Sequence, residues 1–193
     1  MELACLRYGD GKARFHVFTT ADHKDRRSVF VTRSTGDCGG CGASTVVVVF
    51  RNNRVELVEE LGEYGRFGKG PDAIRLRDVV GQPVIEVDHS ISRNDRVTKF
   101  REYFAVDRDR VELSLCLQIA ESDAQPDSAW TSRVSIMAEG TMYFVPSYKI
   151  PDAAGVKPTL LAHSFPFEHG RWRLHEDEGK CLDPRWYDEP VRR

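Results

Sequence analysis

Residue types that often carry catalysis are present in this chain, but their spacing does not predict an active site. Asp88, His89 and Ser90 are the three residue types of a catalytic triad, in adjacent positions. A triad needs its nucleophile, base and orienting carboxylate on separate elements that converge in space. Glu56 and Glu112 could serve as general acid and base only if a cleft kept one of them protonated. Both fall on the polar faces of predicted hairpins, so solvation is expected and no catalytic residue is predicted.

Histidines and acidic residues likewise lack the spacing of metal ligands. The six histidines are spread through the chain, and Asp107 and Asp109 lack the ligand periodicity and glycine of a calcium loop. The glycine-rich stretch 36–42 precedes a strand, whereas a phosphate cradle needs a following helix. We therefore expect neither a metal nor a cofactor.

The five cysteines are Cys5, Cys38, Cys41, Cys116 and Cys181, an odd number that leaves one without a partner in the chain. Cys38-Gly-Gly-Cys41 has a zinc or redox spacing, but structural zinc needs a second close pair of ligands. A redox site needs a helix that begins at the cysteine pair, and here a valine-rich strand follows. For this pair we therefore favour a loop-stapling disulfide or two plain thiols over metal binding or redox catalysis. We predict at least one disulfide, within Cys38–Cys41 or between Cys5 and Cys181.

A loop between two prolines carries the side chains best suited to contact a partner. In the segment 146–151, Ser147, Tyr148 and Lys149 lie between Pro residues that restrict the backbone before binding. Aromatic residues outside strands often anchor interfaces, which adds Trp130 in a predicted connector. These four residues are predicted to bind a protein. The alternative is that Trp130 caps a sheet end and that Tyr148 folds back on the sheet.

Three similar segments predict the elements that would hold these residues. In each of these hairpin segments an apolar residue is followed four positions later by arginine, then by an apolar residue, a polar one and leucine. The arginines are Arg54, Arg110 and Arg171, each expected just beyond a hairpin turn. Trp172 falls on an apolar position of this pattern and is expected in the core. The hairpin segments are residues 50–57, 106–113 and 167–174.

Short runs of alternating apolar and polar residues predict strands throughout, clearest over 111–119, and no long stretch keeps a helical period. We predict a single antiparallel all-β domain over 1–193, built from twelve short strands in three repeat-like sets of four. The units could stack like propeller blades or form a sandwich or barrel of meanders. The expected units span 13–61, 74–120 and 133–176, and residues 182–193 form an extended tail.

Composition excludes some functions. The net charge of −2, with basic and acidic residues interspersed, argues against nucleic-acid binding, which needs a basic surface. No apolar run approaches the roughly 20 residues of a membrane span. No signal segment opens the chain, so residues 1–4 are interpreted as a cytosolic start or as the start of an exported chain whose signal has been removed.

In a cysteine-bearing all-β chain without an active site, the hairpin segments resemble those of periplasmic immunity proteins and lysozyme inhibitors. Gram-negative bacteria use these to neutralise cell-wall-degrading toxins. The resemblance covers residues 44–176, lacks the calcium-type aspartates of some relatives, and shows no lipobox before Cys5. It implies a periplasmic binding protein whose loops, here Tyr148 and Lys149, plug the cleft of a lysozyme-like or other peptidoglycan-degrading toxin. The alternatives are a structural or scaffold domain outside the cytoplasm, a hydrolase with a cleft carboxylate, and, for location, the cytoplasm.

Overall fold

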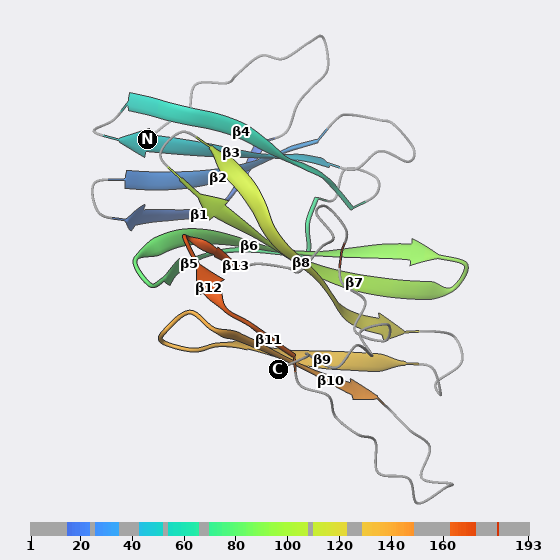
Figure 1. Ribbon diagram of the computed structural model, residues 1–193. Helices are drawn as coiled ribbons and strands as arrows, with labels where there is room; N and C mark the ends of the chain where they lie inside the picture. Colours follow the sequence, from blue (N-terminus) through green and yellow to red (C-terminus); the bar gives the residue numbers. More distant parts are fainter. Residues whose placement is uncertain are drawn as a thin grey trace, which may run out of the picture. The chain divides into compact units, whose positions relative to one another are not determined.

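The computed structural model describes residues 15–23, 26–34, 43–51, 54–65, 70–107, 110–122, 129–148, 163–172 and 181. These residues form antiparallel strands and contain no helix (Figure 1), which confirms the predicted all-β class. The chain divides into two compact units, residues 1–74 and 75–193. In the described part of the chain, no helix is long and apolar enough to cross a membrane.

The first unit contains a four-stranded meander in the order β1-β2-β3-β4. Val47, Val48 and Val49 of β3 are all buried, so both faces of this strand are covered. β-Branched residues suit such a position because their stiff side chains pack well on a pleated surface. The strands are β1 (Phe15–His23), β2 (Arg26–Ser34), β3 (Ala43–Arg51) and β4 (Arg54–Tyr64).

The second unit contains a seven-stranded sheet in the order β11-β10-β9-β8-β7-β6-β5 and a separate two-stranded ladder, β12-β13 (Figure 1). Neighbours in the sheet are consecutive in sequence, so it is a continuous meander. Its strands are β5 (Ala73–Val79), β6 (Gln82–Arg93), β7 (Arg96–Val106), β8 (Val111–Ser122), β9 (Trp130–Ile136), β10 (Met142–Tyr148) and β11 (His163–Phe165). The ladder joins β12 (Phe167–Glu168) to β13 (Arg171–Trp172).

The boundaries of the sheets differ from those of the three predicted repeat units. The first matches β1 to β4, but the second and third share one sheet because β8 pairs with β9 at Ala120–Thr131 and Glu121–Trp130. The three arginines do lie just beyond hairpin turns: Arg54 opens β4, Arg110 immediately precedes β8, and Arg171 opens β13. The last hairpin has strands of only two residues. The segments therefore share a local turn pattern without forming equivalent units.

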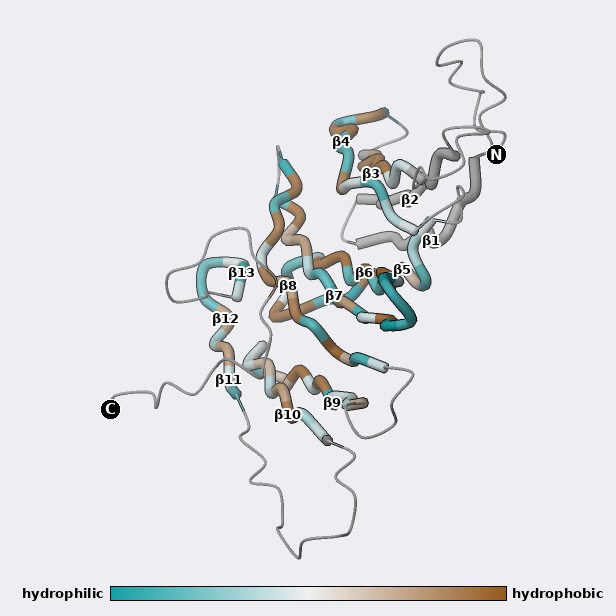
Figure 2. Tube along the Cα trace, turned by 90° about the vertical axis from the view of Figure 1, so that its right-hand side faces the viewer, coloured by the Kyte–Doolittle hydropathy of each residue, from teal (hydrophilic) through white to brown (hydrophobic). Residues whose placement is uncertain are grey.

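One face of the seven-stranded sheet packs around two aromatic side chains from distant parts of the chain. Tyr103 of β7 and Trp172 of β13 are both buried, and their rings meet edge to face with centroids 5.0 Å apart. Leu115 and Leu117 of β8 belong to the same core, as the alternation over 111–119 predicts. In Figure 2 hydrophobic and hydrophilic residues alternate along β7 and β8. This core holds the β12-β13 ladder in place beside β8.

Candidate functional site

The described residues that the sequence predicts for partner binding lie on the neighbouring strands β9 and β10, in different environments. Ser147 is exposed on β10, and Tyr148 ends that strand, paired in register with Trp130. Trp130, which the sequence predicts as a partner contact, opens β9 and is only 1% exposed, because its large apolar surface packs in the core. Lys149 and residues 150–158 lie outside the described residues.

Of the cysteines, Cys5, Cys38 and Cys41 lie outside the described residues. Cys181 forms a disulfide with Cys116 of β8, 65 positions earlier. This pairing replaces the expected Cys5–Cys181 bridge. Cys116 is buried on β8. In the sequence it lies within a predicted strand and far from every other cysteine, so nothing there identifies Cys181 as its partner.

The residues of the apparent triad Asp88-His89-Ser90 point to different neighbours, as consecutive residues of a strand must. The Asp88 carboxylate accepts hydrogen bonds from Arg101 at 2.6 and 2.9 Å. The His89 ring stacks on Phe100, and its Nε2 lies 3.5 Å from Glu102 Oε1. Asp88 therefore does not orient His89, and the two residues do not form a base–orienter pair.

A polar network surrounds Asp88 on strands β5 to β7. Glu86 is only 1% exposed. Its carboxylate accepts hydrogen bonds from Arg75 Nη1 at 2.6 Å and from Arg77 Nε. Arg75 Nη1 also lies 2.9 Å from Asp88. Burial raises the pKa of Asp88, but hydrogen bonds from Arg101 and Arg75 outweigh it and hold that pKa below its usual value. Arginines thus hold Asp88 ionised and form ion pairs with Glu86, which suits a structural role better than proton transfer.

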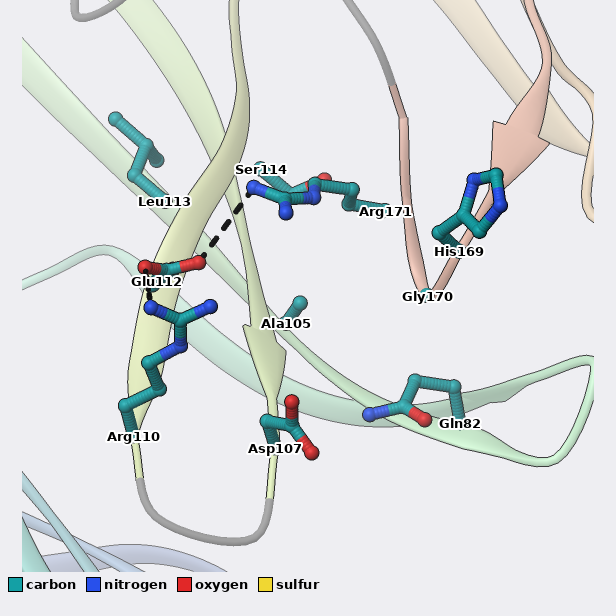
Figure 3. A pocket seen from close by; sticks show the side chains of 10 residues that line it. All are labelled: Gln82, Ala105, Asp107, Arg110, Glu112, Leu113, Ser114, His169, Gly170 and Arg171. Atoms are coloured by element: carbon teal, nitrogen blue, oxygen red, sulfur yellow. Dashed lines mark ion pairs between the residues drawn. The ribbon is translucent and has the colours of Figure 1, made fainter.

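A cavity of about 260 Å³ lies in the second unit, between the β7–β8 hairpin, the start of β6 and the β12–β13 turn (Figure 3). The turn is tight because His169 and Gly170 both adopt positive φ, 52° and 83°. Glycine adopts this conformation without steric cost. The turn directs the Arg171 side chain toward β8 (Figure 3). Polar side chains supply most of the lining, including Gln82, Ser114 and His169.

Two of the three hairpin arginines converge at this cavity on one carboxylate. Arg110 Nη1 lies 2.8 Å from Glu112 Oε1, and Arg171 Nη1 lies 3.6 Å from Glu112 Oε2 (Figure 3). About half of each arginine side chain is exposed, and Glu112 is 42% exposed. Each guanidinium carries five N–H donors, so the pair offers more donors than Glu112 accepts. We call Arg110, Glu112 and Arg171 the arginine pocket.

Trp172 fixes the wall of the arginine pocket that carries Arg171. Its backbone N–H donates to Ser114 Oγ at 2.8 Å, and its indole Nε1–H donates to the carbonyl of Gly140 at 2.8 Å. The indole also meets the ring of Phe167 edge to face at 4.9 Å. Arg171 directly precedes Trp172 in the chain, and the Trp172 side chain is anchored in the core. This anchoring restricts the positions that the Arg171 guanidinium can reach.

Comparisons with protein-family models, with curated proteins and with solved structures found no match. The geometry of the described residues is therefore the basis for a functional inference. It offers two cationic side chains at neighbouring hairpin ends, and the Asp88 and Glu112 carboxylates are both paired with arginine. This arrangement suits recognition of an acidic group better than acid–base chemistry.

Proposed function

We propose that this chain is a binding protein of the bacterial envelope that inhibits a cell-wall hydrolase. In this proposal the arginine pocket faces the active-site cleft of the enzyme. The observation that carries the proposal is the convergence of Arg110 and Arg171, both half-exposed, on the single carboxylate of Glu112. An exposed ion pair contributes little stability, so carboxylates of a partner can take over these arginines at small cost.

The chemistry of the target fits this presentation. Glycan-cleaving enzymes usually hold two carboxyl groups across the scissile bond, about 5–9.5 Å apart. Arginine binds carboxylates through two parallel hydrogen bonds, which gives both strength and orientation. Because Arg171 is attached to the anchored Trp172, less conformational freedom is lost on binding than with a floppy loop. Two arginines from neighbouring hairpin ends can therefore engage such a carboxyl pair together.

Two further observations support a location in the envelope. The Cys116–Cys181 disulfide is of the kind that persists in oxidising compartments such as the periplasm. The hairpin segments also resemble those of periplasmic immunity proteins. In the proposal, exposed Ser147 at the end of β10, with Tyr148 and Lys149 after it, provides a second contact beside the cleft.

Inhibition assays test the proposal. The full chain is titrated into purified lysozymes and other peptidoglycan-cleaving glycosidases while lysis of a cell-wall suspension is followed. At least one enzyme is expected to be inhibited. If both arginines are central contacts, each Arg→Gln substitution costs about 2 kcal/mol, which weakens inhibition about thirtyfold.

The matched control is Arg133→Gln, which removes an exposed arginine of β9 that does not line the pocket. Its inhibition constant is expected to equal that of the parent chain. Two results would contradict the proposal: no glycosidase in the panel is inhibited, or the Arg110→Gln, Arg171→Gln variant inhibits as strongly as the parent.

A further inference from the structure

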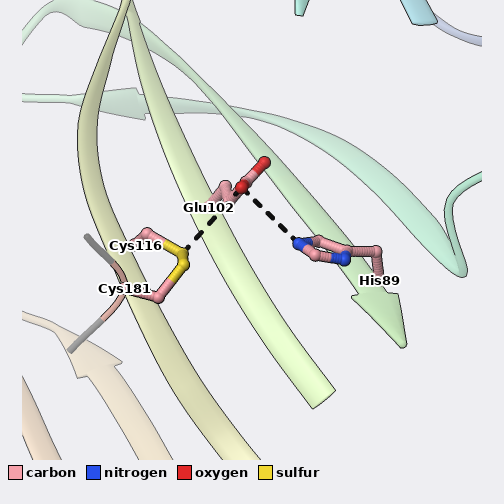
Figure 4. Close-up of a disulfide and its surroundings, with 4 residues drawn as sticks. All are labelled: His89, Glu102, Cys116 and Cys181. Atoms are coloured by element: carbon pink, nitrogen blue, oxygen red, sulfur yellow. Dashed lines mark hydrogen bonds and ion pairs between the residues drawn. A yellow bond between two sulfur atoms is a disulfide. The ribbon is translucent and has the colours of Figure 1, made fainter. Parts of the chain in front are cut away.

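Four side chains that commonly bind metals gather on one side of strands β6 to β8, apart from the arginine pocket (Figure 4). His89 Nε2 lies 3.5 Å from Glu102 Oε1, and Cys116 Sγ lies 3.9 Å from the same oxygen. The donor atoms of Glu102, Cys116 and Cys181 all lie within 4.8 Å of one another. We call these four residues the cysteine–carboxylate cluster.

Strand register creates this cluster. Glu102 of β7 is directly opposite Cys116 of β8, and His89 of β6 is opposite Phe100, two residues before Glu102. The imidazole stacks on the Phe100 ring with centroids 5.2 Å apart, which limits its rotation. The side chains of His89 and Glu102 are only 11% and 15% exposed, and Cys116 is buried. The donors are therefore held by the sheet and mostly shielded from water.

The distances to Glu102 are close to those that a zinc ion needs, whereas the His89 nitrogen is not among the donor atoms that lie within 4.8 Å of one another and must move toward the sulfur atoms when zinc binds. Tetrahedral zinc with bonds of 2.0–2.3 Å places its ligand atoms about 3.3–3.8 Å apart. The Nε2–Oε1 and Sγ–Oε1 separations of 3.5 and 3.9 Å are close to that range. Two thiolates, an imidazole and a carboxylate are all ligand types that zinc accepts. We propose that reduction of the Cys116–Cys181 disulfide opens a zinc site formed by Cys116, Cys181, Glu102 and His89.

The two states exchange by ordinary thiol chemistry. A dithiol reductant attacks the disulfide through its thiolate, forms a mixed disulfide, and then closes on itself, so that it is oxidised by two electrons. The products are two protein thiols and the cyclic disulfide of the reductant. Zn²⁺ then displaces a proton from each thiol. Two thiolates beside the Glu102 carboxylate repel one another strongly, and the divalent cation offsets that repulsion.

The consequence is a choice between two links at the same place. In the oxidised chain a covalent bond joins Cys181 to β8. In the reduced chain, coordination through both sulfur atoms restores that link only when zinc is bound. Zinc should therefore stabilise the reduced protein and leave the oxidised protein unchanged.

The experiment uses the full chain carrying Cys5→Ser, Cys38→Ser and Cys41→Ser, so that only the two cluster cysteines remain. The protein is reduced with dithiothreitol, freed of reductant without oxygen, and titrated with Zn²⁺ alone against a chromophoric chelator. One equivalent is expected to bind, and the thermal midpoint should rise with zinc. The oxidised sample should show neither effect. A Co²⁺ titration should give a thiolate-to-metal charge-transfer band.

Substitution of Glu102 and His89 distinguishes a four-ligand zinc site from zinc binding by the two cysteines alone. Glu102→Gln and His89→Gln should each weaken zinc binding by at least the 10–100-fold seen for outer-shell partners and alter the Co²⁺ spectrum. Lys99→Gln, an exposed change on β7, should leave both unchanged. The proposal is overturned if the reduced chain binds no zinc, if oxidised and reduced samples bind it equally, or if both ligand variants match the parent.

Discussion

Replacing Trp172 with alanine is expected to detach the β12-β13 ladder from the rest of the second unit. This ladder has only two residue pairs, and so small a hairpin has little stability of its own. It is held by the packing of Trp172 against Tyr103 and by the hydrogen bonds to Ser114 and Gly140. Trp172 is 1% exposed, so its loss should leave a large cavity.

The magnitude follows from these contacts. Truncation of a buried tryptophan to alanine costs about 3–5 kcal/mol. Trp172→Phe should keep part of the packing but lose the indole hydrogen bond, which leaves the buried Gly140 carbonyl unsatisfied at about 1–3 kcal/mol. We therefore expect the free energy of unfolding of the second unit to fall in the order parent, Trp172→Phe, Trp172→Ala. Urea titration followed by circular dichroism measures these values.

The control substitution is Met137→Ala, which truncates a residue that is 48% exposed and should change stability by less than about 0.5 kcal/mol. If Trp172→Ala loses less than about 1 kcal/mol, the ladder is not anchored as described. The same result would remove the reason to regard Arg171 as preorganised.

Three other substitutions test the packing and the charged network. Leu115→Ala should cost about 2–5 kcal/mol in urea unfolding, because it leaves a cavity in the core; a loss below 1 kcal/mol would contradict that. Gly140→Ala should lower the thermal midpoint, because φ is +89° and a Cβ would lie 2.8 Å from the Phe167 Cβ; an unchanged midpoint would refute this. Asp88 has a pKa below its unfolded value, so its stabilising contribution is present at neutral pH and is lost as the pH falls below about 4. The stability difference between the parent and Asp88→Asn should therefore shrink in acid, and a difference that grows there would refute the assignment.

Local pattern was sufficient for the class of the fold and for its hairpins. β-Branched runs and alternation predict the strands because side-chain direction has a period of two. The turn position of Arg54, Arg110 and Arg171 is confirmed for the same reason, since turns are set by nearby residues. The burial of Leu115 and Trp172 also follows from pattern.

Strand register and contacts between distant segments could not be predicted from the local sequence pattern. Leu113 is 44% exposed although it belongs to the predicted apolar face. The ladder between β7 and β8 shifts register between Tyr103 and Phe104, and a one-residue shift reverses which face a side chain occupies. The Cys116–Cys181 pair and the meeting of Arg110 with Arg171 depend on segments about 60 residues apart. No local signal in the sequence identifies such partners.

A double-mutant cycle tests most directly whether the arginine pocket engages the catalytic carboxylates of a hydrolase. Arg171→Gln in this chain is combined with a carboxylate-to-amide substitution at each catalytic residue of the most strongly inhibited glycosidase. Dissociation constants are then measured for the four pairings of each cycle. Direct contact predicts a coupling energy of about 1.5 kcal/mol or more for one of the two carboxylates. Coupling within about 0.5 kcal/mol of zero for both carboxylates, and likewise for Arg110→Gln, would contradict the proposed mode of inhibition.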